Sequence, residues 1–534
     1  MDDVWVLAEA LDGPTRPGQA HGLHRIFPRA SGLLCSPVPD GRLSRRSLTS
    51  GVPQKDRGPA MGVRGDEILG CNADGCAGAI DELVRVRAVM ASLGCPLYVG
   101  EGRYGWVCEK PQGAVLVLGP PRCGKTTCII IPNVLAAYGP VVSTSTKEDV
   151  LHATVSTRQK LGRCWIFDPS GQAYDHDGVA RLRWSPVDAC HTWDDATAMA
   201  HLLVRTARMQ AGREEGNFWN ERAGNLLAPL LYAAAISGGG MRAVLRSVQH
   251  RDASDAIGVL ASGGADAKLA LAALSDAETA NDRERSSTYS TVSTVLGAYA
   301  SKAALDNTDD PNFQPELFPD GADTIYICAP SHVQQDVAPI VVGLIKVIQR
   351  ATLARFAERE RAIHRSGTRA DHALHPPVVM ALDELANIAP LWDLGSMIAD
   401  AGSQGLSILA CLQDMSQARE RWDKAADGFF TVFGTKVLFP GIGDYRTLQL
   451  VSSLAGDKDV QVRSVTRQRG WELRKRKPAS DTLSLRREPV LPIDAIAKGR
   501  PGMALVVANL EKPKWAHTTP WYSSEPWRTI VATS

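Results

Sequence analysis

Short apolar runs recur along the chain and predict strands that are buried on both faces of a sheet. Each run holds four or five residues without polar alternation, which is typical of parallel strands covered by helices on both sides. Helical stretches separate the runs, so we expect βαβ units and an α/β fold. The predicted strands are Ala114–Leu118, Val141–Thr144, Cys164–Phe167, Thr324–Cys328, Val378–Leu382, Ser407–Cys411, Lys436–Phe439 and Ala504–Ala508.

The segment between Phe167 and Thr324 shows helical periodicity instead of a strand pattern. A link between two parallel strands needs only about a dozen residues, and this segment is far longer. It therefore predicts an all-α domain inserted into the sheet. Apolar residues at helical spacing include Met199, Ala200, Leu203 and Ala207, and later Leu227, Leu230, Leu231 and Ala234.

The same patterns divide the chain into parts. Residues 1–66 are rich in Gly, Pro, Ser and Arg and predict a poorly ordered tail, although a start codon assigned too early would give the same composition. Apolar positions from 81 to 93 predict a short helix at which ordered structure begins. We expect one α/β domain in two segments, 67–190 and 310–525, and an all-α domain at 191–309.

A phosphate-binding loop is predicted directly after the strand Ala114–Leu118. Residues 119–126 match G-x-x-x-x-G-K-[ST] without a departure, and a helical run follows at 127–135. Glycines at both ends let the backbone wrap around phosphate, while N–H groups and the helix N-terminus face the anion. A simple turn is the alternative, but the flanking elements favour nucleotide binding. The expected nucleotide-binding residues are Gly119, Pro120, Pro121, Arg122, Cys123, Gly124, Lys125, Thr126 and Thr127.

Four residues in or near this loop carry specific expectations. Lys125 should reach the β- and γ-phosphate oxygens, and Thr126 should place its hydroxyl on Mg²⁺. Cys123 would lie at a helix N-terminus, which lowers the pKa of a thiol. The favoured interpretation of Cys123 is instead a small side chain that is tolerated beside phosphate. Pro132 has no N–H group to give to the helix, so it should end or kink it.

Two carboxylates follow the strand Val378–Leu382, at the edge where open α/β sheets bind ligands. We expect Asp383 in the Mg²⁺ shell and Glu384 to polarise an attacking water, with a helix N-cap as the alternative for such a pair. Gln413 ends a neighbouring apolar run and should sense the γ-phosphate or orient water, unless it only serves a turn. The predicted catalytic residues are Lys125, Asp383, Glu384 and Gln413, and the predicted Mg²⁺ ligands are Thr126 and Asp383.

Composition and charge exclude some classes of function but do not identify a binding partner. The chain has 59 Lys+Arg and 58 Asp+Glu, so any nucleic-acid contact must be local. Its 11 cysteines are scattered without a C-x-x-C pair, which favours reduced cytosolic thiols over disulfides. No apolar stretch approaches the roughly 20 residues of a membrane span, and no signal-peptide pattern opens the chain. The 12 histidines show no H-E-x-x-H spacing, so we expect no metal besides nucleotide-bound Mg²⁺.

Several other features have two interpretations each. The basic stretch Arg463–Lys477, with Trp471, suits a DNA backbone and a stacked base, but a solvated hairpin is the alternative. Trp219 is expected to pack in a core instead of offering a stacking surface. Lys147 and Asp168 follow strands at the nucleotide edge, where they either touch substrate or a neighbouring subunit or form turns and caps.

Together these motifs resemble the TraG/TraD-like family of type IV secretion coupling proteins, the hexameric motor ATPases of bacterial conjugation. The resemblance extends from about Val84 to Trp521 and is specific because several unrelated motifs occur in one order. The matching stretches are Leu118–Thr127, Val142–Lys147, Ile166–Pro169, Arg183–Pro186, Asn217–Trp219, Asp323–Pro330, Met380–Leu385 and Gln404–Gln417.

The resemblance implies a RecA-like P-loop NTPase core with an inserted all-α domain, and ATP hydrolysis with Mg²⁺ between subunits of a homo-hexamer. It also implies that relaxase-bound single-stranded DNA or an effector protein is moved towards secretion-channel components at the inner membrane. Such proteins usually carry an N-terminal membrane anchor, and none is present in this sequence. We therefore expect either a peripheral protein on the cytoplasmic side of the plasma membrane or a missing true N-terminus.

Two other functions stay open at this point. One is a soluble DNA translocase or packaging ATPase of the same wider ring family. The other is a non-hydrolysing substrate receptor, for which nucleotide serves only as an assembly ligand. Glu384 argues against the receptor, because a pure scaffold has no chemical need for that carboxylate. The sequence does not single out a trans-acting arginine.

Overall fold

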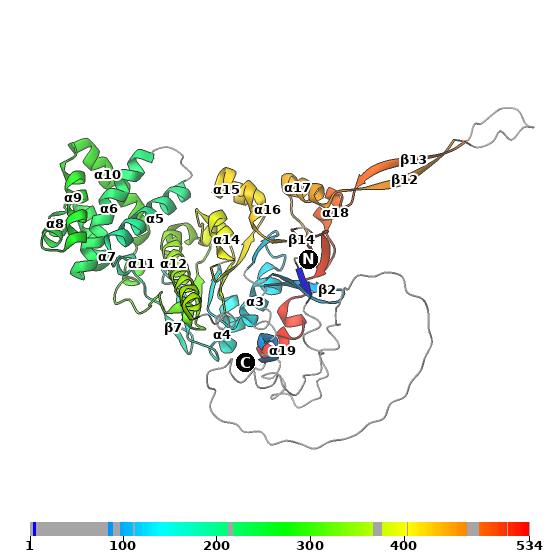
Figure 1. Ribbon diagram of the computed structural model, residues 1–534, viewed down its shortest axis with the longest axis horizontal. Helices are drawn as coiled ribbons and strands as arrows, with labels where there is room; N and C mark the ends of the chain where they lie inside the picture. Colours follow the sequence, from blue (N-terminus) through cyan, green and yellow to red (C-terminus); the bar gives the residue numbers. More distant parts are fainter. Residues whose placement is uncertain are drawn as a thin grey trace, which may run out of the picture.

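In the described part of the chain, a mixed sheet of 13 strands forms the centre, and helices lie on both of its faces (Figure 1). Along β4 (Ala114–Leu118), alternate side chains enter two separate apolar cores, one on each face. Burial on both faces explains the unbroken apolar runs in the sequence. The computed structural model describes residues 4–6, 84–88, 97–110, 113–211, 217–366, 376–402, 404–466, 480–509 and 511–532.

Parallel strands make up one side of the sheet and antiparallel strands the other. The parallel strands, in spatial order, are β11 (Thr435–Leu438), β4, β10 (Leu406–Leu412), β9 (Val378–Leu382), β5 (Val141–Ser145), β8 (Thr324–Cys328), β6 (Cys164–Phe167) and β7 (Val179–Arg181). The antiparallel strands continue from β11 as β14 (Met503–Ala508), β15 (Lys514–His517), β2 (Tyr98–Gly102), β3 (Gly105–Glu109) and β1 (Val4–Val6).

All eight strands predicted from apolar runs are confirmed, with bounds that differ by one residue at most. Strands β1, β2, β3, β15 and β7 were not predicted, because all are short and all except β1 contain glycine or polar residues. β1 falls inside the predicted tail of residues 1–66, and the rest of that tail lies outside the described residues. Of the helix predicted over 81–93, the structure describes residues 84–88, which are helical.

Different helices cover the two faces of the sheet. One apolar core contains residues of α12 (Gln334–Ser366), α13 (Leu385–Ile388), α14 (Leu394–Ala401), α15 (Met415–Trp422), α16 (Phe429–Val432), α17 (Tyr445–Ala455) and α18 (Ile493–Lys498). The other core contains residues of α3 (Ile131–Ala136), α4 (Asp149–Arg158) and α19 (Trp527–Ala532).

A group of helices without strands lies at one end of the molecule, between β7 and β8 in the sequence (Figure 1). The apolar helix α6 (Asn217–Ser237) packs against most of the other helices of this group. Its buried leucines and alanines belong to the same apolar core as the buried residues of α12. The predicted limits of the all-α domain, residues 191 and 309, stay a prediction. The helices packed around α6 are α5 (Trp193–Ala211), α7 (Gly240–His250), α8 (Ser254–Ala261), α9 (Ala265–Thr279) and α10 (Asp282–Val295), and α11 (Lys302–Asp306) follows them.

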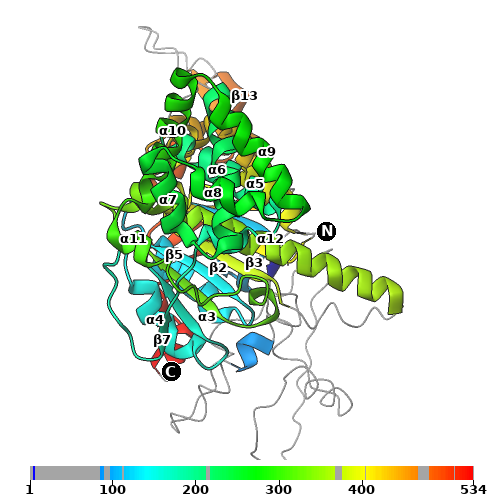
Figure 2. The same ribbon diagram turned by 90° about the vertical axis from the view of Figure 1, so that its left-hand side faces the viewer.

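Helix α12 is the one helix among the described residues that is long and apolar enough to cross a bilayer, so the expectation that no apolar stretch approaches this length is wrong. Most of its apolar stretch is buried inside the protein, including Val341, Leu344 and Ile345, which have no exposed surface. It therefore packs as a core helix of the sheet. Its C-terminal part is charged and extends past the rest of the molecule (Figure 2).

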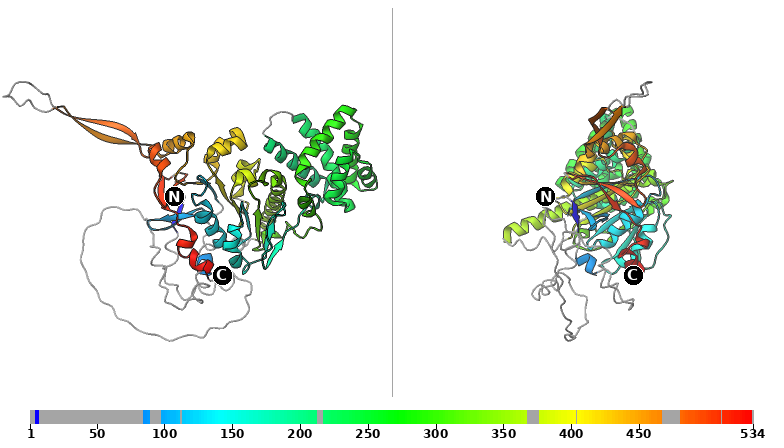
Figure 3. Two further views of the ribbon diagram at one scale, coloured as in Figure 1. Left: turned by 180° about the vertical axis from the view of Figure 1, so that it is seen from behind. Right: turned by 90° about the vertical axis from the view of Figure 1, so that its right-hand side faces the viewer.

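A two-stranded antiparallel ribbon projects from the end opposite the helical group (Figures 1 and 3). It consists of β12 (Asp457–Thr466) and β13 (Ser480–Pro489), and Leu483 and Leu485 on it are largely exposed. The basic stretch Arg463–Lys477 begins in β12, but residues 467–479, with Trp471, lie outside the described residues. The alternatives for that stretch stay open.

The side chain of Asn133, on α3, joins this helix to β2. Its Nδ2 donates hydrogen bonds of 2.8 Å to the carbonyl oxygens of Tyr98 and Ile129, and its Oδ1 accepts one from the Tyr98 backbone N–H. Asn133 and Tyr98 are both buried. Buried backbone groups need partners, so this amide supports the antiparallel side of the sheet.

We expect Asn133→Ala to lower the free energy of unfolding by about 2–4 kcal/mol, because it leaves two buried backbone groups of Tyr98 without a partner. Urea denaturation measures this change. Asn281→Ala is the control, since it removes an exposed helix N-cap on α10 and should cost about 1 kcal/mol. An Asn133→Ala cost no larger than the control would contradict the bridging role.

Candidate functional site: the phosphate loop and the acidic strand

The order of the parallel strands brings three predicted site segments to one edge of the sheet. β10 lies between β4 and β9, and Leu412 is level with Leu118 while Ala410 is level with Leu382. The phosphate loop, Gln413 and the acidic pair therefore leave three neighbouring strands at their carboxyl ends. Ligands of open α/β sheets bind at this edge.

The phosphate loop is folded tightly on itself. Lys125 is buried, and its Nζ donates hydrogen bonds to the carbonyl oxygens of Gly119 at 2.7 Å and Pro120 at 3.1 Å. A Cβ atom at Gly119 would lie 2.5 Å from the Cys123 sulfur, so only glycine fits there. Gly124 has a positive φ of 104°, which side chains rarely adopt. The geometry explains why both glycines of the motif are needed.

The helix that follows the loop is wound unusually. Thr126–Ile130 forms a π-helical turn, in which the Ile131 N–H donates to the Thr126 carbonyl, and α3 continues from it to Ala136. Pro132 therefore does not end the helix, contrary to one expectation. It lacks an N–H, and its ring excludes the carbonyl four residues earlier, so the wider turn before it accommodates the proline.

Thr126 and Asp383 meet directly, although they are far apart in the sequence. The Thr126 hydroxyl donates a hydrogen bond of 2.5 Å to Asp383 Oδ2. On the other side, the Thr144 hydroxyl at the end of β5 donates to the backbone carbonyl of Asp383 at 2.7 Å. The two predicted Mg²⁺ ligands are thus adjacent, and hydroxyl and carboxylate oxygens are the donors that Mg²⁺ prefers.

Burial controls the charge of Asp383. Only 5% of this residue is exposed. Burial raises the pKa of its carboxyl to about 6, and the nearby Glu384 charge adds to the rise, while the Thr126 hydrogen bond opposes it. A cation held between Thr126 and Asp383 would stabilise the ionised carboxylate. The site is therefore suited to a metal ion on electrostatic grounds as well as by its donor atoms.

Glu384 has a left-handed backbone with φ 52° and ψ 41°. This conformation costs a non-glycine residue about 1–2 kcal/mol. Its N–H donates to Asp383 Oδ1 at 3.1 Å, and its Oε2 accepts a hydrogen bond from Asn387 Nδ2 at 3.3 Å. The strained turn places the second carboxylate at the start of α13, half-exposed beside the buried first one.

Gln413 lies where β10 ends, and its backbone N–H donates to Gln417 Oε1 at 2.9 Å. The cap of α15 is Asp414, whose carboxylate accepts hydrogen bonds from the N–H groups of Ser416 and Gln417. The turn and cap are thus built by its neighbours. The sensor role of the Gln413 amide stays a prediction.

Outside the acidic edge, one alternative is excluded and one expectation is wrong. Burial raises the pKa of the Cys123 thiol, and this outweighs the lowering by Lys125, so the lowered pKa expected at a helix N-terminus does not occur. Trp219 does not pack in a core, because it is 37% exposed at the start of α6, beside the more exposed Phe218. The aromatic pair sits ahead of the buried leucines of α6.

The structure shows what Asp168 does, and it leaves the role of Lys147 undecided. Asp168 is buried, and its carboxylate accepts hydrogen bonds from the Ser170 N–H and hydroxyl and from the Ala173 N–H. It therefore organises the turn after β6. Lys147 is exposed, and its backbone N–H donates to the Ser145 hydroxyl at 3.3 Å in the turn after β5, so both alternatives for this residue stay open.

Sequence reasoning missed two residues that hold the acidic pair, Thr144 and Asn387. Thr144 was part of a predicted strand, but its contact depends on the pairing of β5 with β9. Asn387 is three residues after Glu384, and only the left-handed turn brings their side chains together. The one signal in the sequence that could have pointed to Thr144 was the presence of a polar residue at the end of a buried strand.

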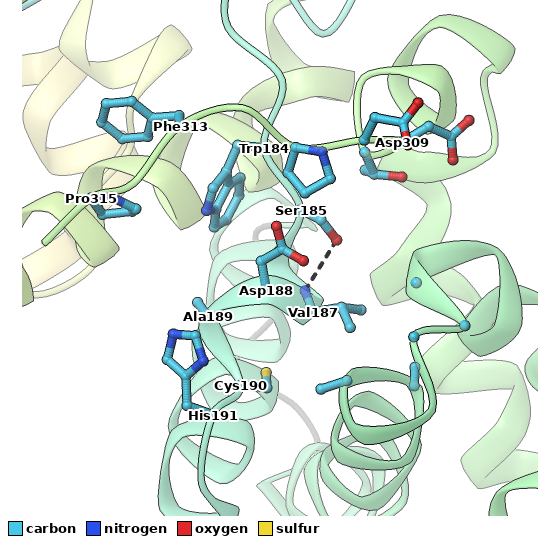
Figure 4. Close-up of a pocket in the computed structure, with 18 of the residues that line it drawn as sticks. Trp184, Ser185, Val187, Asp188, Ala189, Cys190, His191, Asp309, Phe313 and Pro315 are labelled. Carbon is cyan, nitrogen blue, oxygen red and sulfur yellow. Dashed lines mark hydrogen bonds between the residues drawn. The ribbon is translucent and has the colours of Figure 1, made fainter.

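A separate cavity of about 860 Å³ lies near the base of the helical group, between residues 184–191, the end of α6 and residues 308–316 (Figure 4). Asp188 and His191 line it, and within it the Val187 N–H donates to the Ser185 hydroxyl. No residue of the phosphate loop or the acidic pair lines this cavity.

Comparisons with known proteins agree with this arrangement. The chain matches the family described as Type IV secretory system Conjugative DNA transfer over residues 76–532. The conjugal transfer protein TraG of Escherichia coli is 24% identical over 368 residues, covering 64% of this chain and 54% of TraG. The chain thus spans about half the length of that curated relative.

Solved structures of a coupling protein share the fold. The bacterial conjugative coupling protein TrwBdeltaN70, unbound, superimposes with a TM-score of 0.56 at 17% identity, covering 76% of this chain and 84% of that chain. The plasmid coupling protein TrwB in complex with ADP and Mg²⁺ gives 0.55 at 17% identity, covering 79% and 90%. The predicted α/β fold with a RecA-like P-loop core is confirmed.

We expect Asp383→Asn to become more stable relative to the natural protein as pH rises from 4 to 7. The Asp383 carboxyl has a pKa of about 6 in the folded chain and near 3.9 in the unfolded chain. The stability that its protonated form contributes is therefore fully present below about pH 4 and is lost as the pH rises through about 6. Two pKa units correspond to about 2–3 kcal/mol. Urea denaturation of nucleotide-free and Mg²⁺-free protein at both pH values measures the difference.

Asp427→Asn is the control for this experiment, because Asp427, like Asp383, follows the helical group in the sequence but is exposed. Its stability difference from the natural protein should be the same at both pH values. If Asp383→Asn behaved like this control, Asp383 would be ionised without cost and the buried-carboxyl interpretation would be wrong.

Proposed function

Because this chain belongs to the Type IV secretory system Conjugative DNA transfer family, we propose that it is an ATP-hydrolysing coupling protein that drives cargo into a conjugative secretion channel. The contact between Thr126 and Asp383 carries the proposal. It joins the phosphate loop to the acidic strand and leaves Glu384 beside them. A protein that only bound nucleotide would have no chemical need for the second carboxylate.

ATP with Mg²⁺ is the proposed substrate of this site. The loop N–H groups and Lys125 would hold the phosphates, and Thr126 and Asp383 would hold Mg²⁺, which neutralises charge on the transferring phosphoryl group. Lys125 would exchange its two carbonyl partners for phosphate oxygens. The complexes of TrwB with ADP and Mg²⁺ and with an ATP analogue support this assignment by analogy of fold.

Glu384 is the proposed general base. Its carboxylate is half-exposed and hydrogen-bonded to Asn387, so it can accept a proton from a water that attacks the γ-phosphorus. Gln413, directly after the strand between the loop and the acidic strand, is the proposed sensor of the γ-phosphate. Movement at the tip of β10 would pass to α15, which begins two residues later.

The proposed cargo is single-stranded DNA with its relaxase, or an effector protein, delivered to channel components at the inner membrane. We propose a homo-hexamer that acts peripherally on the cytoplasmic side of the membrane. In this proposal residues 67–190 and 310–525 form the nucleotide domain, and residues 191–309 form an all-α domain that receives cargo. The exposed Phe218 and Trp219 place aromatic surface on that domain.

We expect the purified chain to hydrolyse ATP, faster with single-stranded DNA than without it. Lys125→Ala should lower turnover at least about 100-fold by removing phosphate contacts, and Glu384→Gln should lower it about 10²–10⁴-fold while ATP still binds. Steady-state phosphate release and a fluorescent-nucleotide binding assay measure the two effects. Lys424→Ala, at an exposed lysine, is the matched control and should keep full turnover.

Full turnover by Glu384→Gln would contradict the assigned base. Binding of ATP without turnover by the natural chain, even when six copies are joined by a fused hexameric scaffold, would favour the non-hydrolysing receptor. If a relaxase raised the rate of ATP hydrolysis and single-stranded DNA left it unchanged, the cargo that stimulates the site would be protein.

A further inference from the structure

Three metal-ligating side chains converge outside the nucleotide site. Glu148 is the residue before α4, His152 lies one turn into that helix, and His176 belongs to the loop between β6 and β7. One ligand atom of each lies within 4.8 Å of the others. Glu148 and His152 share a helix face because they are four residues apart.

Two of the three ligand–ligand distances are close to those around one tetrahedral ion, and all three are at most 4.8 Å. His176 Nε2 lies 3.0 Å and His152 Nε2 lies 3.7 Å from Glu148 Oε2, and ligands of a tetrahedral zinc at about 2.1 Å are about 3.4 Å apart. The two imidazole rings have centroids 5.1 Å apart and an interplanar angle of 78°. Two imidazoles bound to one such ion hold their centroids about 5 Å apart.

The Glu148 carboxylate contacts the loop that carries His176 and does not cap its own helix, and its Oε2 lies at hydrogen-bonding distance, 3.0 Å, from His176 Nε2. It occupies the N-cap position of α4 but makes no side-chain capping hydrogen bond. Its Oε1 accepts a hydrogen bond of 3.0 Å from the Tyr174 N–H, which orients Oε2 towards the histidines. Hydrogen bonds of this kind around a ligand commonly fix metal sites.

The loop that carries His176 is held on both sides of that residue. Before it, Arg181 bonds to the Asp175 carboxylate. After it, Gln159 Nε2 of α4 donates to the Asp177 carbonyl at 3.0 Å. His176 is therefore placed by its neighbours. Its side chain is 17% exposed, while that of His152 is 63% exposed, which leaves an open path for an ion and room for His152 to rotate.

We propose that Glu148, His152 and His176 bind a divalent transition ion, with Zn²⁺ as the best match. Two imidazole nitrogens and one carboxylate oxygen suit zinc and disfavour Mg²⁺, which prefers oxygen donors. Three protein ligands leave a fourth position for water or a partner's side chain. The proposal departs from the expectation of no metal besides Mg²⁺, because these three residues have no H-E-x-x-H spacing and come together only in the folded chain.

A bound ion would tie the β6–β7 loop to the first turn of α4. That turn begins next to the nucleotide edge, since the Ser145 hydroxyl at the end of β5 donates to Asp149 Oδ1 at 3.0 Å. The inference does not depend on the proposed function, because it concerns binding of the ion and not turnover. It predicts a metal-dependent rise in stability.

The test uses the full chain, free of affinity tags and kept reduced, with ZnCl₂ as the probe. We expect one Zn²⁺ per chain by equilibrium dialysis and elemental analysis, and a raised thermal midpoint. His152→Ala and His176→Ala should each weaken Zn²⁺ binding at least about 100-fold, since changes in supporting residues alone cost 10–100-fold. His364→Ala, an exposed histidine on α12, should bind Zn²⁺ like the natural chain.

Co²⁺ separates this site from binding by free thiols. Co²⁺ held by imidazole and carboxylate gives visible bands without thiolate charge transfer, and His176→Ala should lose those bands. Equal Zn²⁺ binding by His176→Ala and the natural chain would overturn the proposal. Absence of Zn²⁺ binding by folded natural protein, or equal stabilisation by MgCl₂, would overturn it too.

Discussion

The hydrogen bond between Thr126 and Asp383 joins residues 257 positions apart, and the arrangement of the site depends on it. This contact requires β10 to lie between β4 and β9 in a parallel arrangement, so that both loops open on the same edge. Helices on both faces then fix the strands by burying alternate side chains in two cores. The chemistry of the edge is thus a consequence of strand order and register.

The edge also concentrates unfavourable features that the rest of the fold must offset. Asp383 is buried with a raised pKa, Glu384 has a left-handed backbone, and Lys125 is buried beside them. Each feature costs free energy in the folded chain. The large apolar cores on the two faces of the sheet provide the stability that permits them. Such costs are typical of sites in which a charged ligand completes the electrostatics.

The sequence was sufficient for the buried part of the fold and for the identity of the main site residues. Strands covered on both faces leave unbroken apolar runs, and the loop motif has a fixed spacing, so both can be detected locally. The edge strands β2 and β15 are short and partly polar, and they depend on neighbours for their conformation.

The sequence alone could not predict contacts that form only when the chain folds. Thr144 touches Asp383 because β5 pairs with β9, and His176 reaches Glu148 through a loop held by other hydrogen bonds. Trp219 was misjudged because an apolar helix does not reveal which of its ends is covered. The less favoured alternative for Cys123, a lowered thiol pKa, fails because burial outweighs the position of this residue at a helix start.

The burial of the central strands on both faces makes the chain unequally tolerant of changes in length. One residue inserted into β9 would reverse the face of every later side chain and move Asp383 by about 3.3 Å relative to Thr126. The same insertion at the exposed Gly238–Gly239 turn between α6 and α7 would disturb no strand. Relatives of this chain should therefore vary in length within the helical group while keeping the lengths of the strands at the nucleotide edge constant.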